Sequence, residues 1–119
     1  MVSIGCKFVG HGLKKDFNII NIQVPSNQVL DTVEIFHKPR SRKIALRFLA
    51  SYLLNIDIQS QTHDSIEDAM TAFKVYKKYQ ELHSKGKFAQ TLEKIYNLGE
   101  RFDWKSSHQR KQDYINSNK

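Results

Sequence analysis

The sequence predicts an α/β fold, because two short β-prone segments alternate with a helical segment before three amphipathic helices follow. The chain has 119 residues, of which 39% are hydrophobic, so it is long enough for one domain with its own core. It contains only 5 Gly, 2 Pro and 1 Cys, which excludes collagen-like, low-complexity and disulfide-framework proteins.

The first part of the chain alternates between strand and helix. Residues 4–10 (IGCKFVG) are β-prone and bounded by glycines, and they predict a strand that ends in a Gly-His-Gly turn at residues 10–12. Residues 13–22 carry apolar side chains at helical spacing, and residues 29–33 (VLDTV) are rich in β-branched residues and predict a second strand. A strand, a helix and a strand in this order predict a parallel pair with a right-handed crossover.

The second part of the chain predicts three helices and a tail. The predicted helices cover residues 43–54, 64–83 and 88–102. Asp64 with Glu67, or Ser65 with Asp68, has the spacing of a capping box, which marks the start of the middle helix. Residues 105–119 are polar and lack periodicity, so we expect this tail to be disordered.

Basic residues outnumber acidic ones by 19 to 12, and most of their excess lies in the first part of the chain. Residues 1–50 hold 8 Lys and Arg against 3 Asp and Glu, and residues 37–43 (HKPRSRK) hold no acid. Such a cluster suits a phosphate-rich partner, and the alternative interpretation is a solvated loop.

The sequence predicts a soluble protein of a reducing compartment. The longest apolar-rich run, residues 44–56, is interrupted by polar side chains and is shorter than the ~20 residues that a membrane span needs. No basic-then-apolar leader opens the chain, and Cys6 is the only cysteine. We therefore expect a cytoplasmic protein without a membrane partner.

Two places combine an acid near a helix start with a neighbouring histidine. The first is residues 10–17, which include Asp16, and the second is His63-x4-Asp68. Carboxylates are preferred ligands of Mg²⁺, two-metal phosphodiesterase sites hold ions about 3.5–4 Å apart, and a histidine can take a proton from water. In the plainer alternatives, Asp68 only stabilises the helix start, His63 bonds to backbone, and Asp16 pairs with a neighbouring lysine.

Taken together, the two motifs resemble the DEDD family of 3′-to-5′ exonucleases in its histidine branch. Residues 8–17 (FVGHGLKKDF) resemble that family's second motif, in which a strand leads to an aspartate at a helix start. Residues 63–69 (HDSIEDA) resemble its third motif, His-x4-Asp. Residues 31–50 and 62–69 are similar in particular to the catalytic subunits of poly(A)-nuclease deadenylation complexes, and the likeness covers about residues 4–104.

This resemblance implies a fold, a reaction and a set of site residues. The fold would be the three-layer, ribonuclease H-like α/β fold. The reaction would be hydrolysis of the terminal phosphodiester of an mRNA poly(A) tail, with release of 5′-AMP and with two Mg²⁺ ions in the complete site. Asp16 and Asp68 would be metal ligands, and His63 would be the general base. The partners would be poly(A) RNA and the regulatory subunit of the deadenylation complex.

Two groups of residues are expected to contact the RNA. By resemblance, the glycine-rich turn would lie beside the terminal nucleotide, and by charge the basic cluster would follow the phosphate backbone. These residues are His11, Gly12, Leu13, Lys14, Arg40, Arg42 and Lys43.

One motif of the family is missing. No Asp-x-Glu, which would supply the other two metal-binding carboxylates, occurs in the sequence, and the family's first strands are absent. We therefore expect residues 1–104 to be the C-terminal part of an N-terminally truncated exonuclease domain. The strand at residues 4–9 would then lack a neighbour, and the chain alone would have little nuclease activity. The alternatives are another histidine-branch RNA exonuclease and a non-catalytic, basic RNA-binding remnant.

Overall fold

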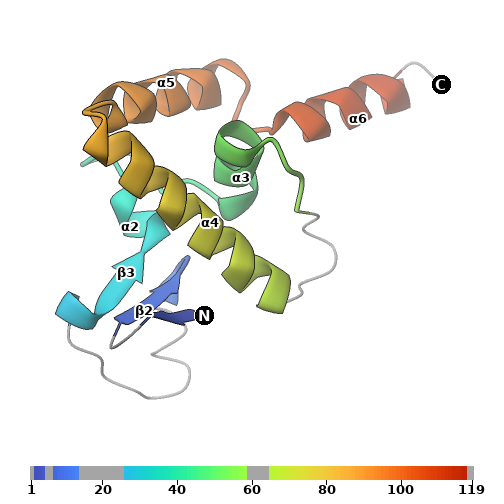
Figure 1. Ribbon diagram of the computed structural model, residues 1–119. Helices are drawn as coiled ribbons and strands as arrows, with labels where there is room; N and C mark the ends of the chain where they lie inside the picture. The colour runs from blue at the N-terminus through green and yellow to red at the C-terminus, as the bar shows by residue number, and fades with distance from the viewer. Residues whose placement is uncertain (1, 5–6, 14–25, 59–64, 118–119) are drawn as a thin grey trace.

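The computed structural model describes residues 2–4, 7–13, 26–58 and 65–117. The elements in chain order are β1 (Val2–Ile4), β2 (Lys7–Gly10), the 3-10 helix η1 (Ser26–Gln28), β3 (Val29–Asp31), α2 (Thr32–Ile35), α3 (Leu46–Leu54), α4 (Ser65–Ser84), α5 (Phe88–Arg101) and α6 (Ser107–Ser117). The long helix α4 packs against the sheet and against α3. Helices α5 and α6 lie on the side of the molecule away from the sheet (Figure 1). The predicted mixture of a parallel strand pair and covering helices is confirmed.

The sheet has three strands in the order β1-β2-β3. β2 pairs with β3 in parallel, with Val9 opposite Leu30, as the sequence predicts. β2 also pairs with β1 in antiparallel fashion, with Ser3 opposite Phe8. The single strand predicted over residues 4–10 is thus divided, with Ile4 at the end of β1 and Lys7–Gly10 as β2. The expectation that it lacks a neighbour is wrong for the described residues, because β2 pairs with β1.

The second predicted strand is shorter than expected and passes directly into a helical turn. β3 ends at Asp31, whose side chain accepts a hydrogen bond from the backbone N–H of Val33 at 3.1 Å. This contact makes Asp31 the N-cap of α2, because a side-chain acceptor at this position replaces the missing helical partner. Sequence propensity indicated strand through residue 33, and the capping contact overrides it.

The middle helices begin and end close to their predicted positions. Helices α4 and α5 are confirmed, and α4 is followed by Gly86, which has φ 67° and donates to the carbonyl of His83 at 3.1 Å. Helix α3 begins at Leu46, three residues later than predicted, because Ala45 keeps an extended backbone with ψ 147°. The predicted helix over residues 13–22 lies outside the described residues beyond Leu13.

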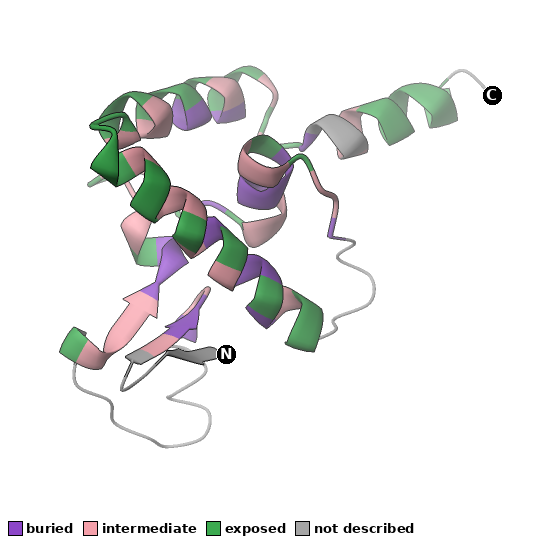
Figure 2. Ribbon diagram, in the orientation of Figure 1, coloured by how far each residue is buried: buried purple, intermediate pink, exposed green. Residues whose placement is uncertain are grey.

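The core lies where α2, α3, α4 and α5 meet. Its fully enclosed side chains are Phe36, Ile44, Phe48, Leu49, Val75, Ile95 and Tyr96. Phe36 makes edge contacts with the rings of Tyr79 and Phe88, at centroid distances of 6.2 and 5.3 Å. The buried faces of α3, α4 and α5 turn toward this cluster, and the outer face of α4 is exposed (Figure 2).

The tail that we expected to be disordered contains the helix α6, so this expectation is wrong. The backbone N–H of Ser106 donates to the Gln109 side chain at 2.8 Å, and the N–H of Gln109 donates to the Ser106 hydroxyl at 3.1 Å. These reciprocal bonds form a capping box, which satisfies two of the free N–H groups at the helix start. A salt bridge of 2.9 Å between Lys105 and Asp113 further ties the helix to the preceding loop.

The described helices also bear on membrane association. Not one of them combines the length and the apolar character that crossing a bilayer would require.

Candidate active site

The Gly-His-Gly turn lies at the end of β2, beside the end of β3. Gly12 has φ 78°, a backbone conformation that side-chain-bearing residues rarely adopt, so a glycine suits this position. The carbonyl of Gly10 accepts a hydrogen bond of 3.0 Å from the buried hydroxyl of Thr32. The predicted turn is thus confirmed, and its place is fixed by the residue that follows β3.

The carboxylate of Asp31 holds this turn in place. One oxygen accepts the backbone N–H of Gly12 at 2.8 Å, and the other accepts that of Leu13 at 2.8 Å. Asp31 is only 7% exposed and also caps α2. A carboxylate that accepts several backbone N–H groups in a buried position is a strong structural tie. Asp31 therefore positions the backbone of Gly12 and Leu13.

His11 is inserted between the two layers, and both of its ring nitrogens have partners. Nδ1 lies 2.8 Å from the hydroxyl of Thr32, and Nε2 lies 3.0 Å from the carbonyl oxygen of Ile44. A carbonyl only accepts, so Nε2 carries a hydrogen. Burial lowers the pKa of His11, and the charges of Asp31 and Asp68 and the bond to Ile44 oppose this effect. His11 is thus a half-buried link between the turn after β2, the first residue of α2 and the loop before α3.

Asp68 lies in the first turn of α4, the helix that packs on β2. Its side chain is half-buried, and its negative charge is close enough to raise the pKa of His11. Within the residues that the structure describes, no hydrogen bond or salt bridge engages this carboxylate. Among the described residues, the carboxylate of Asp68 thus has no hydrogen-bond or salt-bridge partner, and its charge acts on His11 of the Gly-His-Gly turn.

The groups of the turn that could bond to RNA are largely used inside the protein. Both nitrogens of His11 and the N–H groups of Gly12 and Leu13 have protein partners, and the Leu13 side chain is 1% exposed. The hydrogen bonds of the turn are thus directed into the protein. The turn lies in the region of Asp68, and only its outer surface can contact other molecules.

The basic cluster lies on a loop before α3, and several of its charges have partners. Lys38 pairs with Glu93 at 2.8 Å, and Lys43 pairs with Glu34 at 3.3 Å. The guanidinium of Arg42 stacks over the ring of Trp104 at 4.7 Å. The loop also holds the exposed Arg40, which has φ 65°. The cluster is therefore less positive than its sequence indicates.

The tyrosine Tyr96 fixes the shape of this loop. Its hydroxyl accepts the backbone N–H of Lys38 at 3.0 Å and donates to the carbonyl of Arg42 at 2.7 Å. Because one buried side chain holds both ends of the loop, the backbone of the basic cluster is set by the core.

Three of the predicted site residues, Lys14, Asp16 and His63, lie outside the described residues. Among the residues that are described, no group of three or more His, Cys, Asp or Glu side chains could hold a metal ion. Of the proposed metal ligands, the described part of the chain places Asp68 alone. The structure brings His11, Gly12 and Asp68 into one region and sets Arg40, Arg42 and Lys43 on a separate loop.

The sequence interpretation gave no role to Asp31 and Thr32. Their signal was present, because a polar pair follows directly after the predicted second strand, at the edge where parallel strands end. The sequence did not indicate the hydrogen-bond partner of Asp31, because Gly12 lies 19 residues away from it.

Comparisons with known proteins agree with this arrangement. The profile of the family RNase_T, described as exonuclease, matches residues 2–76. The catalytic subunit PAN2 of the PAN2-PAN3 deadenylation complex of Homo sapiens is 55% identical over 109 residues. That match covers 88% of this chain and 9% of the relative, so the chain spans about a tenth of the length of the curated relatives that it matches.

Solved structures give the same result. The Neurospora crassa Pan2 catalytic unit, with protease and nuclease domains, superposes with a TM-score of 0.74 at 63% identity, covering 77% of this chain and 15% of that chain. The Saccharomyces cerevisiae Pan2 pseudoubiquitin hydrolase-RNA exonuclease module in complex with A7 RNA superposes with a TM-score of 0.81 at 48% identity, covering 85% of this chain and 17% of that chain.

The family profile covers more than half of the chain, and the sheet, the turn after β2 and the acid in α4 fall inside it. The fold of the chain is that of the ribonuclease H-like exonucleases. The chain belongs to the exonuclease family.

Proposed function

We propose that this chain is part of the nuclease of a deadenylation-complex catalytic subunit, which shortens mRNA poly(A) tails in the 3′-to-5′ direction and releases 5′-AMP. One observation carries the proposal: the half-buried Asp68 presents an unengaged carboxylate, among the described residues, beside the turn that Asp31 fixes. The 55% identity to subunits of that name supports the choice of poly(A) as substrate.

Asp16 and Asp68 are the proposed metal ligands of this chain. The donor chemistry fits, because carboxylate oxygens suit Mg²⁺ and Asp68 has both of its oxygens available among the described residues. Bound Mg²⁺ stabilises charge on the attacking and leaving oxygens of phosphodiester hydrolysis. Exonucleases of this family use divalent metal ions, and the choice of Mg²⁺ is part of the proposal.

The remaining roles belong to the side chains and backbone around this acid. His63 takes the proton of the attacking water, since an imidazole titrates near neutral pH. The turn at His11 and Gly12 borders the terminal nucleotide, and its inward hydrogen bonds keep that border rigid. Arg40, with Arg42 and Lys43, contacts the RNA backbone from the neighbouring loop, where Tyr96 holds the main chain.

We further propose that these 119 residues alone have little activity, that the active enzyme is cytoplasmic, and that it works with the regulatory subunit of the complex. The sequence has no Asp-x-Glu, so only half of the family's carboxylates are present to bind metal. Two acids hold two divalent ions more weakly than four, because each missing carboxylate removes both charge and ligand atoms.

A chimera tests the proposal directly. This sequence would replace the matching segment of the human catalytic subunit, to which it is 55% identical, so that the rest of that protein supplies Asp-x-Glu. With Mg²⁺, we expect release of 5′-AMP from an RNA with a 3′ poly(A) tail, and at least a 100-fold lower rate for Asp68→Asn. The 119-residue chain on its own should release little or no 5′-AMP in the same assay.

The controls separate the competing functions. A folded chimera that binds RNA but lacks activity would identify a non-catalytic RNA-binding remnant. A chimera that removes structured 3′ ends faster than poly(A) would identify another histidine-branch exonuclease. Full activity in the Asp68→Asn chimera would exclude the proposed metal ligand, and robust activity of the isolated chain would overturn the proposal that it is inactive alone.

A further inference from the structure

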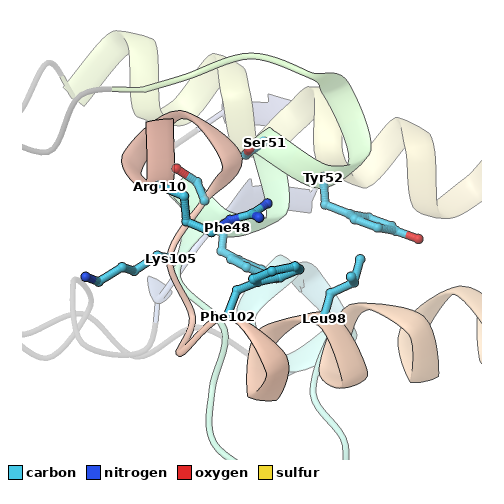
Figure 3. Close-up of a pocket in the computed structure, with 8 residues that line it drawn as sticks. Phe48, Ser51, Tyr52, Leu98, Phe102, Lys105 and Arg110 are labelled. Carbon is cyan, nitrogen blue, oxygen red and sulfur yellow. The ribbon is translucent and has the colours of Figure 1, made fainter. Parts of the chain in front are cut away.

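A cavity of about 170 Å³ lies between α3, α5 and α6. None of its lining residues belongs to the proposed active site. The lining residues are Phe48, Ser51, Tyr52, Leu98, Phe102 and Arg110, with Lys105 and Ser106 at the loop before α6. α6 thus closes one side of a hollow whose other walls are the aromatic faces of α3 and α5 (Figure 3).

Arg110 is the unusual member of this lining. Its guanidinium carbon lies 3.7 Å from the centroid of the Phe102 ring. Its Nε is shielded from solvent and has no hydrogen-bond acceptor among the described residues. Figure 3 shows the nitrogen end of this side chain directed from α6 into the space between Tyr52 and Phe102. Buried donors nearly always have an acceptor, so a missing acceptor marks a place where one can be supplied.

The charged side chains that line the cavity are all basic among the described residues. A second arginine, Arg101, lies over the same Phe102 ring at 5.3 Å. Lys105 also lines the cavity, although its ammonium group pairs with Asp113 at 2.9 Å. No acidic side chain is present among the lining residues. The cavity therefore offers an aromatic wall next to a guanidinium that has no acidic partner among the described residues, which suits an anionic group on an apolar stem.

The size of the cavity narrows the class of ligand. Pockets for small molecules and cofactors usually measure about 300–1,000 Å³, so this cavity is too small for a nucleotide. Its volume leaves room for one inserted amino-acid side chain. A single inserted side chain that carries a carboxylate fits the volume, the apolar wall and the positive charge of the cavity.

We propose that this cavity is a docking site for an acidic segment of a partner protein, which inserts one glutamate side chain. The methylene groups of the glutamate pack against Phe48, Leu98 and Phe102, and its carboxylate binds the guanidinium of Arg110. Arginine suits this role better than lysine because its planar fork binds a carboxylate through two parallel hydrogen bonds. The site is independent of the proposed nuclease function.

Binding can be followed at the cavity itself. The probe is a capped hexapeptide of alternating leucine and glutamate, and its matched control replaces each glutamate with glutamine. Trp104, the only tryptophan, contacts Phe48 at a centroid distance of 5.4 Å, so its fluorescence reports on the cavity wall. The Nε–H resonance of Arg110 in an NMR spectrum reports on the guanidinium. We expect the glutamate peptide to shift both signals and the glutamine peptide to shift neither.

Two variants separate this site from general attraction to a basic protein. Arg110→Lys keeps the charge and loses the planar fork, and we expect it to weaken peptide binding about tenfold or more. Arg101→Lys makes the same change on the same ring, at an exposed residue outside the cavity, and should leave the affinity unchanged. Circular dichroism of both variants confirms that α6 is retained.

Several results would overturn the proposal. Equal binding of the two peptides would show that the carboxylate is not recognised. An equal loss in Arg101→Lys and Arg110→Lys would reduce the effect to surface charge. A hexa-adenylate oligonucleotide that shifts the Arg110 resonance, where the glutamate peptide does not, would assign the cavity to RNA instead.

Discussion

Two aspartates at helix starts, Asp31 and Asp68, have opposite surroundings. Asp31 is buried at the start of α2 and accepts the backbone N–H groups of Gly12, Leu13 and Val33 at 2.8–3.1 Å. Asp68 is half-buried in the first turn of α4, and no hydrogen bond or salt bridge involves it within the described ranges. One carboxylate is saturated by backbone donors, and the other has no such donor among the described residues. A position at a helix start therefore does not distinguish a structural aspartate from one that can take part in chemistry. The hydrogen-bond partners of the carboxylate make this distinction.

The largest expected effect is that of Asp31→Ala. This change leaves three backbone N–H groups without their acceptor in a buried place, and we expect it to lower the free energy of unfolding by about 3 kcal/mol or more. Urea unfolding followed by circular dichroism measures the loss. Asp31→Asn keeps one acceptor oxygen and should lose less. A loss below about 1 kcal/mol for Asp31→Ala would mean that Asp31 is not the tie that the geometry indicates.

Thr32→Val tests the structural role of this region at the residue that follows Asp31. Valine keeps the shape of threonine but removes the hydroxyl, which donates to the Gly10 carbonyl at 3.0 Å and lies 2.8 Å from Nδ1 of His11. We expect a loss of about 2 kcal/mol, because both partners stay enclosed. Thr91→Val is the matched control, since its hydroxyl also bonds to a carbonyl but at the surface. Equal losses in the two variants would show that the hydroxyl of Thr32 has no special role.

These two residues also show what the sequence could and could not predict. Local sequence signals were enough to predict the strand pair, helices α4 and α5, and an acid at the start of α4. The residues that carry these signals lie within a few positions of one another. The contact of Asp31 with Gly12 spans 19 residues and depends on the parallel pairing of β2 and β3. No local pattern carries such a contact.

The basic loop and the last helix were misjudged for a different reason. The charge of residues 37–43 looks unopposed in sequence, but Glu34 and Glu93 reach it from neighbouring helices. For α6 a local signal existed, because Ser106 and Gln109 have the spacing of a capping box. The polar composition of the tail outweighed that signal in the sequence interpretation.

A smaller effect, confined to acidic pH, concerns His11. Burial lowers its pKa in the folded protein, so the unfolded chain binds a proton first as pH falls. The stabilisation is complete above about pH 6.5, the ordinary pKa of histidine, and decreases as the pH is lowered toward the folded pKa. We expect the free energy of unfolding to fall less steeply below this pH in His11→Gln than in the natural sequence. Urea unfolding at a series of pH values measures these slopes, and equal slopes in His11→Gln and the natural sequence would contradict the prediction.

The smallest expected effect on stability, and the sharpest test of the comparison, is that of Asp68→Asn. The change removes no hydrogen bond or salt bridge that the described residues make, so only the favourable interaction with the helix start is lost, about 0.5 kcal/mol. Urea unfolding without metal measures this loss. A loss above about 2 kcal/mol in Asp68→Asn alone would make Asp68 a structural acid like Asp31. A small loss, together with the loss of activity in the chimera, would separate the two aspartates as the geometry does: Asp31 holds the turn, and Asp68 beside it remains available for chemistry.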